Sequence, residues 1–176
     1  MNGLVGSRRL ASPVRLTLAK QLGRDIDGAW WPRSASVAKE LPELVEVLQR
    51  PLGEIVDINI NWSPGEGQLD LNTIAAGSRT PAVLKPTRPR VMSVAGRTQC
   101  VKLLVVPHMT SEALGGIVMR CAAGMAVDNM VRNTALYETA VRILGTANEE
   151  STRWLARRAG GAAVPVATAE SSSAGA

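Results

Sequence analysis

The chain has 176 residues, of which 45% are hydrophobic and 20% are charged, and its formal net charge is +5. This length and composition suit one domain with a sizeable core and exclude wholesale disorder. We predict a flexible arm over residues 1–12, a single domain over 13–158 and a disordered tail over 159–176. With two cysteines and no uninterrupted apolar span, we expect a soluble, cytoplasmic protein without a membrane partner.

Polar and apolar residues alternate over residues 14–18, which predicts the first strand. Turn-forming residues around two adjacent tryptophans predict an ordered loop or short strand over 23–34. A helix follows from Ser34, because apolar residues then recur with helical period. Pro42 predicts a kink or two helical pieces, and the helix ends near Pro51 and Gly53.

The clearest period-2 alternation lies over residues 54–62 and predicts a half-buried strand. Its apolar face is predicted to carry Val56, Ile58, Ile60 and Trp62, and its polar face Asp57, Asn59 and Asn61. Residues 72–89, rich in Thr, Ala, Gly and Pro, indicate a long loop. Residues 90–106 then predict a β-hairpin whose nearly all-apolar second strand lies centrally in the sheet.

Three helices are predicted after the hairpin. The first covers about 111–125, with Thr110 as its cap, and its glycines Gly115 and Gly116 indicate close packing against another element. The second begins near Met130 and ends at Gly145, and a short amphipathic helix covers 148–158. The order of elements predicts an α+β fold: an antiparallel sheet of four to six strands with helices on one face, and C-terminal helices.

The segment Asp27-Gly-Ala-Trp-Trp-Pro-Arg-Ser34 follows Arg15-Leu-Thr-Leu18 and precedes Ala38-Lys-Glu-Leu-Pro42. Together with Leu103-Leu-Val-Val-Pro-His108, it resembles the signature of an actinobacterial family of unknown function, domain of unknown function 5994. The resemblance covers roughly residues 13–125. It implies a bacterial cytosolic protein and carries no activity with it.

No catalytic set is visible in the sequence. His108 is the only histidine, and no nucleophile turn, phosphate loop or helical metal pair accompanies it. Cys100 and Cys121 lack a Cys-x-x-Cys spacing and are expected to be core thiols. We therefore expect no metal and no cofactor, and we expect a binding protein rather than an enzyme.

The candidate binding segment is the loop with the two tryptophans. Adjacent side chains in extended chain point in opposite directions, so we expect one tryptophan in the core and the other partly exposed. The acidic pair could share a cation or proton transfer, although bonding to its own turn backbone is the simpler role. The candidate ligand or partner residues are Asp25, Asp27, Trp30, Trp31, Arg33 and His108.

A basic run without acidic residues suggests contact with phosphates as one alternative and a plain solvated edge as the other. Its residues are Lys85, Arg88, Arg90, Arg97 and Lys102. The leading hypothesis is a non-enzymatic binding or regulatory domain with a protein partner. The alternatives are weak association with RNA or DNA through the basic run, and a small enzyme that uses His108.

Overall fold

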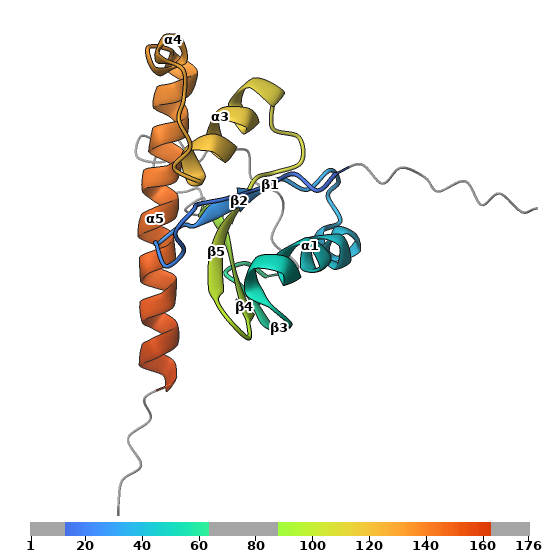
Figure 1. The fold of residues 1–176 in the computed structure, drawn as a ribbon. Coiled ribbons are helices and arrows are strands. Elements are labelled where there is room, and N and C mark those ends of the chain that lie inside the picture. Colours follow the sequence, from blue (N-terminus) through green and yellow to red (C-terminus); the bar gives the residue numbers. More distant parts are fainter. Residues whose placement is uncertain (1–12, 64–87, 163–176) are drawn as a thin grey trace, which may run out of the picture.

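The computed structural model describes residues 13–63 and 88–162, which form five strands and four helices. The strands are β1 (Leu16–Leu18), β2 (Gly28–Trp30), β3 (Ile55–Ile60), β4 (Arg90–Gly96) and β5 (Cys100–Val105). They form one sheet in the order β1-β2-β5-β4-β3 (Figure 1). The predicted α+β class and strand number are confirmed. The predicted arm over 1–12, residues 72–87 of the predicted loop over 72–89, and the predicted tail beyond residue 162 lie outside the described residues.

The hairpin of β4 and β5 forms the centre of the sheet, as the apolar sequence of β5 predicts. β5 also pairs with β2 in parallel, with Gly28 opposite Leu103 and Trp30 opposite Val105. The other three pairings are antiparallel. The sheet is therefore mixed, and its one parallel pair joins segments that are far apart in the chain.

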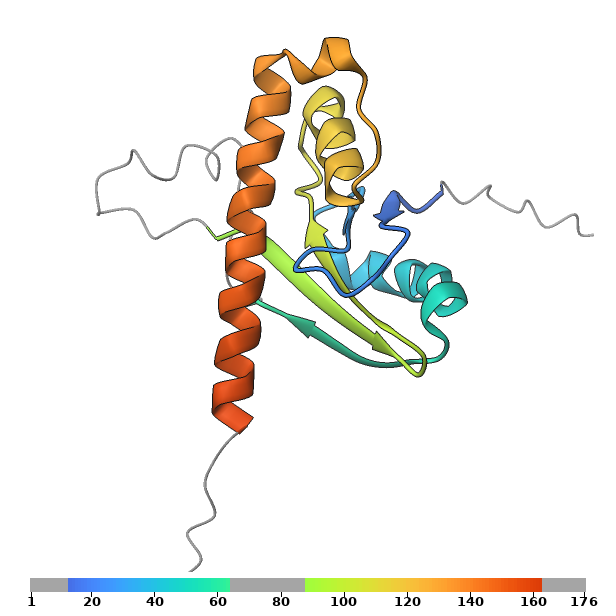
Figure 2. The same ribbon diagram turned by 60° about the vertical axis from the view of Figure 1, so that its left-hand side comes forward.

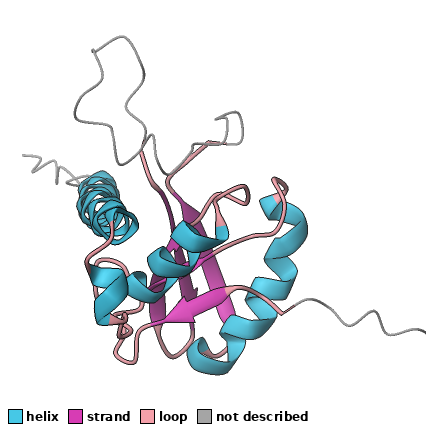
Figure 3. Cartoon of the chain, turned by 90° about the horizontal axis from the view of Figure 1, so that it is seen from above, coloured by secondary structure: helices cyan, strands magenta, loops and turns pink. Residues whose placement is uncertain are grey.

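The helices cover both faces of the sheet. They are α1 (Val37–Leu52), α3 (Glu112–Ala122), α4 (Asn129–Arg132) and α5 (Ala135–Ala162). Figure 3 shows the strands between α1 on one side and α5 on the other, and Figure 2 shows α3 beside the upper half of α5. The expectation of helices on one face is wrong in this respect. Leu103 and Leu104 point to opposite sides of β5 and both are fully buried, so each face needs a cover.

Two apolar clusters result. On the α1 side, leucines of that helix pack with Trp30 and with alternate residues of β4 and β5. On the other side, residues of α3 and α5 pack with Ile26, Trp31 and the remaining alternate residues. Both clusters pack against the same strands, so we expect a loss of packing in one cluster to weaken the other.

Strand β3 departs from the predicted alternation at Val56. The pairing with β4 shifts register between Ile55 and Asp57, which inserts one extra residue. Ile55 and Ile58 consequently pack on the α1 side, while Val56 is exposed. A bulge of this kind leaves no mark in a binary pattern of apolar and polar residues.

Two helices run through residues that predict breaks. α1 is one element from Val37 to Leu52 with Pro42 inside it, because its buried leucines hold it against the sheet at the cost of a helical hydrogen bond. α5 continues through Gly145 to Ala162 and replaces the two helices predicted over this part of the chain. The first four residues assigned to the tail are thus helical. The cap of α3 is Ser111, whose hydroxyl accepts from Leu114 N, instead of Thr110.

Side-chain hydrogen bonds attach α5 to the sheet and its loops. The Ser151 hydroxyl donates to the backbone oxygen of Asp25 at 2.6 Å. Asn61 accepts from Val91 N at 2.9 Å and donates to Pro89 O at 2.9 Å and to Glu150 at 3.3 Å. Ser151 thus connects α5 to the β1–β2 loop, and Glu150 connects it through Asn61 to the chain after β3 and to β4. Among the helices of the described residues, none has the length and apolar character needed to cross a membrane.

Candidate functional site

Both tryptophans of the predicted binding loop are core residues. Trp30 is 2% exposed and packs on the α1 side, and Trp31 is 6% exposed and packs on the α3 side. The opposite orientation of the two side chains is as predicted, but the partial exposure of one of them is wrong. Helices cover both faces of the sheet, so both directions lead into a core. Neither indole is available to stack on a partner.

Trp31 joins the loop to its surroundings. The Arg15 guanidinium lies 3.9 Å from the centroid of the Trp31 ring and donates to the backbone oxygens of Trp31 and Pro32. Burial, followed by repulsion from Arg33, lowers the pKa of Arg15. On α3, Gly115 leaves room for the ring, since a Cβ at that position would lie 2.4 Å from it. The predicted close packing of this glycine is confirmed.

Asp27 organises the turn before β2. It is fully buried, and one carboxylate oxygen accepts from Gly23 N and Arg24 N, both at 2.8 Å. The other oxygen accepts from Lys102 N at 2.9 Å. Asp27 therefore bonds turn backbone, which was the simpler of its two predicted roles. Asp25 is exposed, and its side chain takes no part in this network.

Arg33 belongs to a polar contact at the start of α1. Glu40 accepts from Arg33 N at 2.7 Å and from both the amide and the hydroxyl of Ser34 at 2.9 Å. Burial favours the neutral acid, but these hydrogen bonds outweigh it and lower the pKa of Glu40. The Arg33 side chain donates to Pro13 O. Both interactions hold the chain on either side of β1 and β2 in place.

His108 follows β5 at the rim of a cavity of about 10 Å³, which is room for about one water molecule. Its Nδ1 atom is buried without a hydrogen-bond partner in the described part of the chain. Thr110, the nearest hydroxyl in sequence, donates to Pro107 O instead. Within residues 13–63 and 88–162, no three His, Cys, Asp or Glu side chains are grouped to hold a metal ion.

The basic residues of the predicted run are dispersed. Arg88 lies 3.9 Å from Glu150, and Arg97 pairs with Glu54 at 2.6 Å at the opposite end of β4. Arg90 stacks over Trp62 on the α1 side, whereas Lys102 follows the alternation of β5 to the other side. Lys85 lies outside the described residues. The four described residues of the run do not share one surface, and the nucleic-acid alternative stays a prediction.

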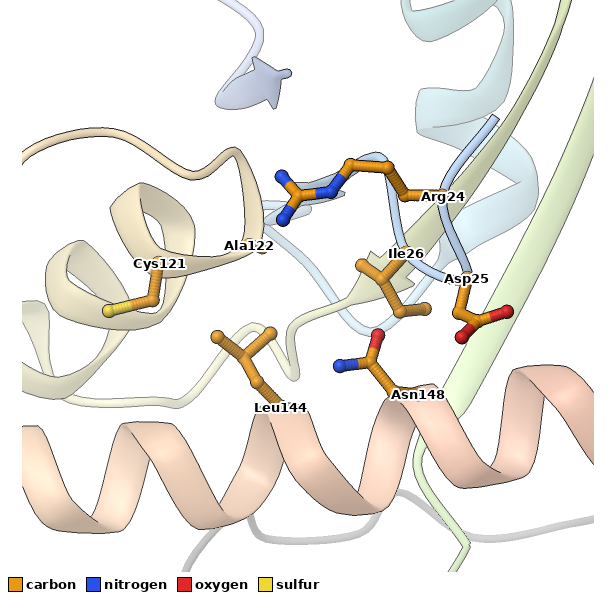
Figure 4. Close-up of a pocket in the computed structure, with 7 residues that line it drawn as sticks. All are labelled: Arg24, Asp25, Ile26, Cys121, Ala122, Leu144 and Asn148. Carbon is orange, nitrogen blue, oxygen red and sulfur yellow. The ribbon is translucent and has the colours of Figure 1, made fainter. Parts of the chain in front are cut away.

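Among the described residues, a pocket lies between the β1–β2 loop, the end of α3 and the middle of α5. It has a volume of about 290 Å³ (Figure 4). Its lining residues are Arg24, Asp25, Ile26, Cys121, Ala122, Leu144 and Asn148. Of these, the sequence singled out only Asp25 as a candidate site residue.

The pocket has apolar side chains at its floor and polar ones at its rim, and most of its exposed lining is polar. Ile26 and Ala122 are buried and Leu144 is partly buried, while Arg24, Asp25 and Asn148 are exposed. Among the described residues, no ion pair forms at Arg24 or Asp25, and no side-chain hydrogen bond forms at Asn148. The guanidinium of Arg24, the carboxylate of Asp25 and the amide of Asn148 therefore surround the apolar floor of the pocket without forming ion pairs or hydrogen bonds to one another.

The two cysteines differ in position. Cys121 lines the pocket, and burial raises the pKa of its thiol despite the nearby Arg132. It is thus mainly a neutral thiol at physiological pH and a poor nucleophile. Cys100 begins β5 and is exposed, so the expectation of two core thiols is wrong for this residue. Cys100 lies next to the turn of the hairpin, where the helices do not cover the sheet.

A mixed five-stranded sheet between helices, with an open pocket beside one of them, defines an α+β domain with a candidate ligand site. Residues 15–122, more than half of the chain, match the family of unknown function DUF5994. The chain belongs to this family. The match includes the tryptophan segment, the hairpin and α3, and ends before α5. No curated protein and no solved structure matches the chain.

Proposed function

We propose that this protein is a non-catalytic binding domain that holds a small molecule in the pocket between the β1–β2 loop, α3 and α5. The observation that carries the proposal is the set of unpaired polar groups around an apolar floor. Arg24, Asp25 and Asn148 each offer a group for which the described residues provide no partner. Ligand sites combine such a floor with a few convergent polar groups.

The pocket is supported by rigid elements. Asp27 holds the backbone of Arg24, and Ser151 holds the backbone oxygen of Asp25. The opposite wall is the packed interface of α3 and α5. A preorganised wall lowers the cost of ordering side chains when a ligand binds.

Binding would also stabilise the packing of α5 against the β1–β2 loop. Any ligand that contacts the loop and α5 together stabilises the attachment of α5 to the domain, because it binds the folded arrangement only. The proposal thereby includes a regulatory role, in which occupancy of the pocket controls the order of α5. The protein partner expected from the sequence stays a prediction.

The test is a thermal-shift screen of the full chain against a library of small charged metabolites. We expect at least one compound to raise Tm in the wild type. Asn148→Trp should abolish the shift by filling the pocket, and Glu149→Trp, which places the same bulk next to the pocket, should preserve it. A library without any stabilising compound, or an equal shift in both variants, would overturn the proposal.

A further inference from the structure

We propose that the ligand of this pocket is a small dipolar molecule whose anionic and cationic groups stand at opposite ends of a short apolar chain. An ω-amino acid is the simplest member of this class. The inference rests on the proposed function and adds the chemistry of the ligand. It is argued from the positions of Arg24 and Asp25 relative to the apolar floor.

The two charges lie on different sides of the pocket. In Figure 4, the Arg24 side chain extends toward Ala122 at the end of α3, whereas Asp25 lies toward Asn148 on α5. The side chain of Ile26 lies between them. A ligand that meets both charges must therefore carry its own charges apart, with an apolar segment in the middle.

The Arg24 side chain lies close to the backbone after α3. Gly124 has a φ of +64°, and a Cβ there would lie 2.8 Å from a terminal nitrogen of the Arg24 guanidinium. The absent side chain lets the guanidinium lie close to the end of α3. It can then present donors to a carboxylate in the pocket in bidentate geometry.

The opposite end of the pocket suits an ammonium group. The Asp25 carboxylate supplies a charged acceptor, and the amide oxygen of Asn148 supplies a neutral one. Neither side chain is engaged in a hydrogen bond within residues 13–63 and 88–162. An ammonium group, with its three donors, fits two acceptors better than a neutral hydroxyl does.

The floor accounts for the middle of the ligand. Leu144 and the small exposed parts of Ile26 and Ala122 offer a short aliphatic surface that a few methylene groups can contact. The volume of about 290 Å³ is at the small end of ligand pockets and suits a small molecule. An α-amino acid carries both charged groups on its α-carbon, so it matches charges on different sides of Ile26 less well than an ω-amino acid does.

The test uses calorimetric titration of the full chain with 4-aminobutanoate, 5-aminopentanoate and 6-aminohexanoate. L-Valine is the matched control, because it is a constitutional isomer of 5-aminopentanoate with its charges adjacent. Pentanoate and pentylamine each retain one charge. We expect at least one ω-amino acid to bind about tenfold more tightly than any of these controls, since each charged hydrogen bond contributes roughly this factor.

Variants locate the two ends of the ligand. Arg24→Gln and Asp25→Asn should each weaken binding of the ω-amino acid about tenfold, and Asp25→Asn should leave pentanoate unaffected. Glu149→Gln removes a charge from α5 outside the pocket and should change nothing. Equal loss in all three variants would show an effect that is not specific to the pocket and would overturn the assignment.

The outcomes separate this inference from the proposed function. If L-valine or pentanoate binds as tightly as the ω-amino acids, or if none of the compounds binds while the metabolite screen finds another ligand, the dipolar class is wrong and the pocket remains a ligand site. If none binds and the screen also finds no ligand that Asn148→Trp blocks, both proposals fail.

Discussion

Gly115 and Gly116 are neighbours on α3 with opposite surroundings. A Cβ at Gly115 would lie 2.4 Å from the Trp31 ring, and a Cβ at Gly116 would have nothing within 4 Å. We expect Gly115→Ala to lower the free energy of unfolding by about 1–3 kcal/mol through overpacking. Gly116→Ala should raise it by roughly 0.5–1 kcal/mol, because alanine favours the helix. Urea denaturation measures both, and a stable Gly115→Ala would contradict this account of the tryptophan segment.

Glu40 predicts a dependence of stability on pH. Although burial opposes its ionised form, hydrogen bonds from Arg33 and Ser34 lower the pKa of Glu40 below its ordinary value of 4.5. The folded state therefore gains stability from ionised Glu40 above pH 4.5, and loses it as the pH falls through the lower pKa of the folded state.

Glu40→Gln tests this dependence against Glu43→Gln, an exposed neighbour on α1. The difference in unfolding free energy between wild type and Glu40→Gln should be largest near neutral pH and shrink in acid. Glu43→Gln should follow the wild type throughout. The same curve for both variants would remove the role of Glu40. The measurement is urea denaturation at a series of pH values.

At the scale of elements, the attachment of α5 depends on Glu150. This carboxylate is buried, lies 3.1 Å from Arg157 and 3.9 Å from Arg88, and accepts from Asn61. Loss of the negative charge at a buried carboxylate lowers the stability of the fold, because the positively charged partners no longer have an ion-pair partner. We expect Glu150→Gln to destabilise the fold by about 1–3 kcal/mol.

Glu149→Gln is the matched control, since Glu149 forms only an exposed pair with Arg153 on the same helix. Such pairs contribute about 0.5 kcal/mol or less. Hydrogen exchange of α5 amides distinguishes a local effect from a global one: protection should fall in Glu150→Gln and stay unchanged in Glu149→Gln. Unchanged exchange in both variants would mean that other contacts hold α5.

The elements that the sequence predicts well are those with a strong period. The hairpin, β1, α1 and α3 lie within a few residues of their predicted positions. Where the structure differs from the prediction, the cause is packing or pairing with another element. Gly145 lies inside α5 because Ile143 and Ala147 are buried on the same helix, and packing overrides the low helix propensity of glycine. The bulge at Val56 depends on pairing with β4, which a single strand does not encode alone.

The pocket could not be predicted in the same way. Its floor combines Ile26 with Leu144, which are far apart in sequence and meet only in the folded chain. In a pattern of hydrophobicity, both are ordinary core residues. The two adjacent tryptophans are unusual in a sequence and suggest a binding segment, yet a rare residue type is not for that reason exposed. The charge of Asp25 marks it as a candidate site residue, whereas Arg24 and Asn148 carry no signal apart from their polarity.

At the scale of the whole molecule, the two apolar clusters share one sheet and should unfold together. Leu48 belongs to the cluster under α1, and Ile143 to the cluster under α5, and both are fully buried. We expect Leu48→Ala and Ile143→Ala each to lower the unfolding free energy by about 2–5 kcal/mol.

In each variant, far-UV circular dichroism and tryptophan fluorescence should report the same midpoint in urea, because unfolding is cooperative. Trp30 reports on the α1 cluster, and Trp31 and Trp154 report on the other. Two separated transitions in either variant would show that the clusters are independent and would contradict the coupling through the sheet.

The parallel pairing of β2 with β5 has a consequence for the order of folding during synthesis. β5 is the strand that both β2 and β4 require as a neighbour, and it comes late in the chain. Until the ribosome has released residue 105, β1 and β2 have no sheet to join. The side chains of Trp30 and Trp31, which are buried in the folded domain, therefore stay without their core until β5 has been synthesised.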